Sequence, residues 1–88
     1  MVQSFEDIAP SGDEVMDYDR EHTTLYLWLL DRQHCSEDWR TTVRALFEID
    51  PENEPARARS VYDSHLARAA WFAKTSYFDH LIRHTNWL

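Results

Sequence analysis

The chain has 88 residues and a formal net charge of −7. Hydrophobic residues make up 43% of it, with four Trp, four Tyr and four Phe, which is enough for one small core and excludes a fully disordered chain. One glycine and three prolines leave too few turn residues for a small β-barrel or sandwich. Sixteen acidic against nine basic residues disfavour a protein that coats DNA or RNA. The composition therefore predicts an all-α domain.

Residues 1–16 are predicted to form a flexible acidic arm. They contain a Pro-Ser-Gly sequence and no periodic apolar pattern. Residues 1–21 carry seven acids and a single base. Phe5 and Ile8 are the points at which the arm could dock. The remainder, residues 17–88, is predicted to be one helix-turn-helix-like domain, a small bundle of four to five helices.

The first two helices of the domain are predicted over residues 19–34 and 37–48. Ser36 is the expected cap of the second helix, and the two acids that follow it suit the positive end of a helix. A spacing of 100° per residue defines one apolar side on each helix. These inward positions are His22, Leu25, Tyr26, Leu29 and Leu30 on the first helix, and Trp39, Val43, Leu46 and Phe47 on the second.

A break at Pro51 separates the second helix from a long third helix. The third is predicted to begin at Asn53 or Glu54, with Pro55 in its first turn, and to end near residue 73. Its inward positions are Ala58, Val61, Tyr62, His65, Leu66, Ala69, Phe72 and Ala73. A fourth helix is expected after Ser76, burying Tyr77 or Phe78 with Leu81 and Ile82. A short helix, a turn and a longer helix are typical of helix-turn-helix domains.

The histidines do not form a recognisable metal motif. His80 and His84 have the i, i+4 spacing of two zinc ligands on a helix, but two ligands do not make a site, and the His34-Cys35 pair is better explained as a helix end. A Cys/His nucleophile also needs an orienting group and an oxyanion cradle, and the single glycine lies in the arm. We expect no metal, no cofactor and no enzymatic activity.

One cysteine, Cys35, excludes an internal disulfide and is typical of a reducing compartment. The sequence contains no apolar run of membrane-spanning length and no basic stretch followed by an apolar one near its start. We therefore expect a cytoplasmic, monomeric protein that has no export signal and makes no membrane contact.

Three stretches of the sequence carry a resemblance to a known family. They are the Trp39-Arg40 pair that opens the second helix, the Ser-His-Leu-Ala-Arg-Ala run at residues 64–69, and Tyr77 followed by Leu81-Ile82-Arg83. Over residues 18–84 the chain resembles a helix-turn-helix-variant family, formerly of unknown function, found on proteobacterial integrative and conjugative elements. Some members of that family activate excision and transfer genes, and small stand-alone members, the QseM-like proteins, are antiactivators.

The short, acidic chain is most similar to the stand-alone members. The resemblance implies an antiactivator that binds quorum-sensing activators of the TraR (LuxR-like) type and an FseA-like excision activator, and blocks both. DNA-binding relatives carry more arginines on the long helix, whereas residues 54–73 here carry three Arg against two acids. DNA binding is therefore disfavoured.

Two groups of exposed positions are candidates for partner binding. A one-sided first helix would place Leu27 and Trp28 away from the core, where the arm, the fourth helix or a partner could cover them. The outer face of the long helix is the DNA-reading face in helix-turn-helix proteins, and its small residues equally suit packing of another helix. The candidate residues are Arg40, Arg57, Arg59, Ser60, Asp63, Ser64, Trp71, Leu27 and Trp28.

Two other functions are consistent with the sequence. The first is a DNA-binding transcriptional regulator that uses the helix at residues 54–73, with Arg57 and Arg59 near the bases; these arginines are equally typical of solvated positions or of partners for acidic neighbours. The second is a nucleic-acid mimic whose acidic arm occupies a basic groove on its target. A protein-binding role agrees best with the net charge and the surplus of aromatic residues.

Overall fold

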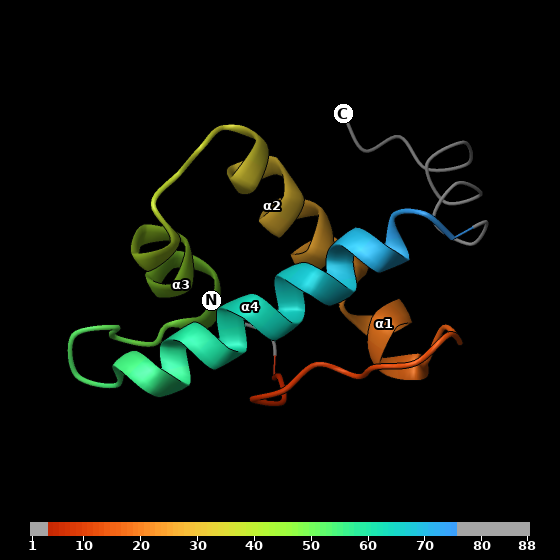
Figure 1. Cartoon of the computed structure of the whole chain (residues 1–88), viewed down its shortest axis with the longest axis horizontal. Helices are drawn as coiled ribbons and strands as arrows, with labels where there is room; N and C mark the ends of the chain where they lie inside the picture. Colours follow the sequence, from red (N-terminus) through yellow and green to blue (C-terminus); the bar gives the residue numbers. More distant parts are fainter. Residues whose placement is uncertain (1–3, 76–88) are drawn as a thin grey trace.

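The computed structural model describes residues 4–75, and all regular secondary structure in that range is helical (Figure 1). Helix α1 spans Asp17–Glu21, α2 spans Thr23–His34, α3 spans Trp39–Phe47 and α4 spans Pro55–Phe72. The predicted all-α fold is thus confirmed for this part of the chain. The helix predicted after Ser76 lies outside the described residues.

The single helix predicted over residues 19–34 is wrong, because the chain forms two helices that meet at His22. His22 has φ −110° and ψ 20°, which ends α1 and begins α2. The hydroxyl of Thr23 donates to the carbonyl oxygens of Asp19 and Arg20, at 3.1 and 3.0 Å. Such side-chain bonds to the preceding turn compete with regular helical bonding and bend a helix. The break lets α1 turn away from α2.

The cap predicted for the second helix is also wrong. The helix begins at Trp39 rather than at residue 37, and the Asp38 carboxylate caps it by accepting the backbone N–H of Arg40 at 2.9 Å. Ser36 instead adopts a left-handed φ of 59° in the turn before the helix. The break at Pro51 and the start of the long helix at Pro55 are confirmed. Helices α3 and α4 are thus joined by residues 48–54.

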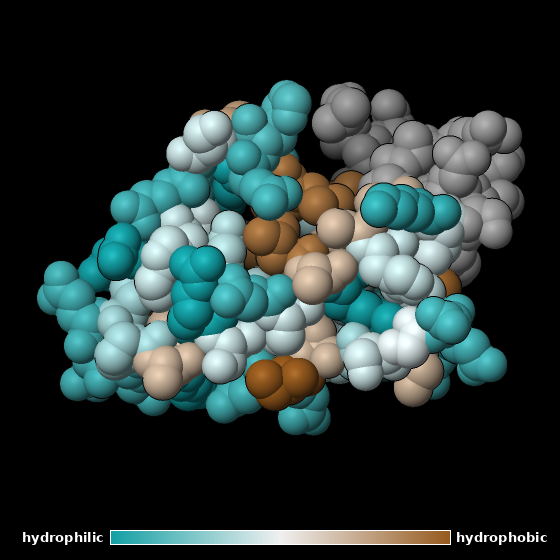
Figure 2. All heavy atoms as spheres, viewed as in Figure 1, coloured by the Kyte–Doolittle hydropathy of each residue, from teal (hydrophilic) through white to brown (hydrophobic). Residues whose placement is uncertain are grey.

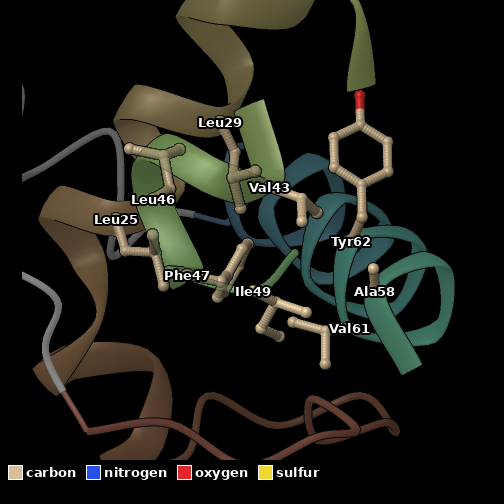
Figure 3. Packing of buried hydrophobic residues seen from close by; sticks show 9 residues of the cluster. All are labelled: Leu25, Leu29, Val43, Leu46, Phe47, Ile49, Ala58, Val61 and Tyr62. Carbon is tan, nitrogen blue, oxygen red and sulfur yellow. The ribbon is translucent and has the colours of Figure 1, made fainter. Parts of the chain in front are cut away.

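Three helices contribute to the main core. Figure 3 shows nine of its side chains converging from α2, α3, the start of the α3–α4 connection and α4. They are Leu25, Leu29, Val43, Leu46, Phe47, Ile49, Ala58, Val61 and Tyr62. A second cluster joins Tyr26 on α2 to Ala69 and Phe72 on α4. Together they make α2 and α4 the most extensively packed helix pair.

Most predicted core positions are buried, but four are only half-buried: Leu30, Trp39, Leu66 and Ala73. Trp39 is the first residue of α3, so it packs at the edge of the core rather than inside it. The sequence pattern also missed three buried residues that lie outside the helices: Ala9 in the arm, and Ile49 and Pro51 after α3.

The described part of the arm, residues 4–16, runs along α4 (Figure 1). The ring of Phe5 packs edge-on against Phe47 with 5.0 Å between centroids, as expected for a docking residue. Ile8 behaves differently, because its side chain remains 63% exposed. The sequence did not predict that the arm lies against the long helix. Its flexibility stays a prediction.

Candidate protein-interaction surface

The first turns of α4 are covered by the arm through an ion pair. The Arg57 guanidinium donates to the Asp7 carboxylate at 3.1 to 3.2 Å and also lies near Glu54. These bonds raise the pKa of Arg57. Both side chains of the Asp7–Arg57 pair are about half exposed, so water screens the pair and its contribution to stability is small. The pair positions the arm but holds it weakly.

About two turns after Arg57 on α4, the arm backbone makes a second contact with the helix. The N–H of Ala9 donates to the hydroxyl of Ser64 at 3.1 Å, and Ala9 is 6% exposed against the helix. Ser60, one turn before Ser64, is exposed on α4. The stripe of small residues predicted to accept another helix is therefore contacted by an extended segment in this structure.

The strongest attachment lies at Arg68, which is buried together with Asp19. The guanidinium donates from Nε and Nη2 to the two Asp19 oxygens, at 2.9 and 2.7 Å, and to the backbone oxygens of Gly12 and Glu14. The same carboxylate accepts the hydroxyl of Tyr26 at 2.8 Å. Burial opposes ionisation of Asp19, but the bonds from Arg68, Met16 N–H and Tyr26 keep its pKa below the ordinary value. The network joins α1, α2, α4 and the arm.

Between these attachment points the arm and α4 enclose a shallow, mostly apolar groove of about 350 Å³. Trp71 lines it at the far end, and the guanidinium of Arg68 lies 3.9 Å from the centre of the Trp71 ring. The other lining residues are Ile8, Ala9, Pro10, Ser11, Gly12, Ser64 and Ala67. Trp71 therefore presents an aromatic edge beside an opening that a side chain of another molecule could enter.

The start of the arm is attached to α1 and α4 through a chain of hydrogen bonds. Glu6 N–H donates to the Tyr18 hydroxyl at 3.0 Å, and that hydroxyl lies 2.5 Å from Nε2 of His65. Nδ1 of His65 lies 2.8 Å from the Val61 carbonyl oxygen, which can only accept. The Val61 contact therefore assigns a proton to Nδ1, and because burial lowers the pKa of His65, the neutral ring accepts at Nε2 from the Tyr18 hydroxyl. His22 adds a contact of 2.7 Å to the Ser4 carbonyl oxygen.

The buried His65 predicts a pH-dependent stability. Burial lowers the pKa of His65, and the Val61 carbonyl offsets this only in part. The unfolded chain then binds more protons than the folded one, so this contribution is present above about pH 6.5 and is lost progressively as the pH falls from there toward the lower pKa of the folded state. We expect the urea midpoint to fall between pH 7.5 and 5.5 more steeply in the wild type than in His65→Gln. His34→Gln, at an exposed position, should retain the wild-type slope, and equal slopes in all three proteins would contradict the prediction.

A second surface lies on the other side of α4, where two arginines flank Trp39. The guanidinium carbons of Arg40 and Arg59 lie 5.1 and 4.8 Å from the Trp39 ring centre. Arg59 also pairs with Asp63 at 3.0 Å, and Arg40 lies 3.6 Å from its own helix cap, Asp38. Cation–π contacts of this kind hold the arginines over the ring and leave their outer faces accessible.

The other predicted group, Leu27 and Trp28 on α2, is only partly exposed. Trp28 is 53% exposed and lines a hollow with Asp31, Arg32 and residues of α3, while Leu27 is half-buried. In Figure 2, hydrophobic atoms also reach the surface in the angle between α2 and α4 and along the lower edge of the view, where the arm runs.

The structure therefore distributes the nine predicted partner-binding residues over three places rather than one. Arg57, Ser60, Ser64 and Trp71 follow the arm side of α4, Arg40, Arg59 and Asp63 surround Trp39, and Leu27 and Trp28 lie on α2. Sequence reasoning missed Arg68 as the centre of the buried network. Its spacing was the available signal, since it lies three residues after His65 and four before Phe72, on the buried stripe of α4.

Known chemistry and known proteins give little further guidance. Within residues 4–75, His, Cys, Asp and Glu do not gather in threes that could hold a metal ion, and His80 and His84 lie outside this range. No helix in the described range is long and apolar enough to cross a membrane. Comparisons with protein-family models, curated proteins and solved structures find no match.

Proposed function

We propose that this protein is an antiactivator, a non-catalytic cytoplasmic protein that binds transcriptional activators of the TraR/LuxR type and the FseA type. By inhibiting them it would repress excision and conjugative transfer of an integrative element. The sequence resemblance at Trp39-Arg40 and residues 64–69 motivates this proposal. Its partners are proteins, and its working unit is the helical domain with the arm.

One observation carries the choice of a protein partner over DNA. A DNA-reading helix contacts the duplex with its N-terminal turns, and on α4 these turns carry Arg57. Here Arg57 pairs with Asp7, which follows Glu6 on the arm. The carboxylates of Glu6 and Asp7 at the start of α4 repel DNA phosphates, and Asp7 occupies the Arg57 side chain that would contact a phosphate. The first turns of α4 thus favour a protein partner over a nucleic acid.

Co-purification and a mobility shift test the proposal together. A tagged copy of this protein should retain a purified TraR/LuxR-type or FseA-type activator, and it should leave duplex DNA that carries the activator's operator unshifted at 50 to 200 mM salt, the range over which phosphate contacts weaken steeply. A salt-dependent shift by this protein alone would favour the DNA-binding regulator that uses residues 54–73. Failure to retain either activator would contradict the antiactivator proposal.

A further inference from the structure

We infer that the groove between the arm and α4 binds a basic helix of the partner, of the kind that a DNA-binding protein turns toward phosphates. This inference rests on the proposed function and specifies its contact surface. The groove offers apolar walls from Ile8, Pro10, Ala67 and Trp71. Ile8 and Ala67 are exposed and Trp71 is half-buried, so an incoming apolar side chain would cover surface that now faces water.

Charge complementarity identifies the occupant. The arm brings an acidic pair to each end of the groove, Glu6-Asp7 at Arg57 and Asp13-Glu14 at Arg68. Arg57 and Arg68 are paired with Asp7 and Asp19, and Asp13 also acts electrostatically on Arg68. With Glu6, Asp13 and Glu14 exposed as well, the carboxylates here still outnumber the two arginines and leave an excess of negative charge. A cationic partner gains from that field, and an anionic one is repelled.

The spacing of the two acidic pairs suits a helix. Arg57 and Arg68 are eleven residues apart on α4, which is about 16 Å at 1.5 Å per residue. A partner helix of about three turns covers the same length, with arginines or lysines at its two ends and an apolar side chain between them. This is the pattern of a helix that contacts DNA phosphates at both ends. Occupation of the groove would therefore compete with DNA for the same helix.

A peptide tests the chemistry of the groove without the activator. The probe is a fluorescein-labelled helical peptide of about 14 residues, with arginines at both ends and leucine in the middle. We expect Asp13→Asn/Glu14→Gln to weaken its binding at least about fivefold at low salt, with the difference fading as salt increases. Both substitutions keep the backbone oxygens that Arg68 contacts. Asp31→Asn/Glu52→Gln removes the same charge elsewhere and should stay within about twofold of wild type.

The full chain with a purified activator tests the occupant. We expect the Asp13/Glu14 variant to lose activator affinity at least about fivefold, and duplex operator DNA to release the wild-type protein from the activator. A stable complex of activator, DNA and this protein would overturn the inference, as would equal affinities for the two double variants. If the activator binds neither the wild type nor the variants, while the peptide still binds the Asp13/Glu14 variant more weakly than the wild type, the proposed function fails and the basic-helix site stands. A peptide that does not discriminate them overturns the site, whatever the activator does.

Discussion

Replacing Arg68 with Ala is expected to remove a large part of the free energy that keeps the protein folded. The substitution removes both charged bonds to Asp19 and leaves that carboxylate buried among Tyr26 and the helix backbone. Breaking a buried ion pair from one side costs about 3–5 kcal/mol, because the remaining charge is left without its counterion. A domain of this size has a free energy of unfolding on the order of 5–10 kcal/mol. Circular dichroism during urea unfolding measures the loss.

Arg57→Ala is the matched control for this experiment, since it removes an arginine from the same helix. Its partner Asp7 is about half exposed, so we expect a much smaller loss of stability than for Arg68→Ala. Similar midpoints for the two variants would mean that Asp19 reaches water when Arg68 is absent. Because the pKa of Asp19 is lowered in the folded chain, the wild type should keep this contribution above about pH 3.8 and lose it only in stronger acid.

The helices that the sequence located best are those whose ends depend on local chemistry. Pro51 and Pro55 restrict their own backbone, so the break before α4 and its first turn followed directly from residue type. The division at His22 was missed because it depends on hydrogen bonds from Thr23 to carbonyl oxygens. Threonine is compatible with a helix interior as well, so its identity alone does not predict the bend.

The candidate surface was less predictable because its contacts join distant parts of the chain. Asp7 and Arg57 are fifty residues apart, and nothing in either segment specifies that they pair. Arg68 was missed for another reason. Arginines are rarely buried, so its position on the buried stripe between His65 and Phe72 does not by itself predict burial. Once Asp19 is known to be buried beside it, the exception is explained.

Trp71→Ala is expected to weaken binding of the activator at least about tenfold, which is roughly 1.4 kcal/mol, and Arg59→Glu tests whether the face around Trp39 contributes to binding as well. Tryptophan and arginine commonly dominate the energetics of protein interfaces. Trp71 contributes an aromatic edge to the groove beside the arm, and Arg59 lies over Trp39 on the other side of α4. Titration of each purified variant against the activator measures the loss.

Trp71→Ala and Arg59→Glu differ in their expected effect on folding. Arg59 is exposed, pairs with Asp63 one turn away and lies over the Trp39 ring, and because such surface contacts contribute little to stability, Arg59→Glu should remain folded. Trp71 packs against the cluster of Tyr26 and Phe72, so circular dichroism must show that Trp71→Ala retains its helical signal before its affinity is compared.

The pattern of losses then locates the interface. A loss in Trp71→Ala alone places the partner in the groove between the arm and α4, because Arg59 lies outside that groove. A loss in Arg59→Glu alone places it on the face around Trp39, where Arg40 is the next residue to exchange. If both variants are folded and bind as wild type does, α4 is not the contact surface. The leading candidate is then α2, where the half-exposed Trp28 and its neighbour Leu27 are the residues to replace.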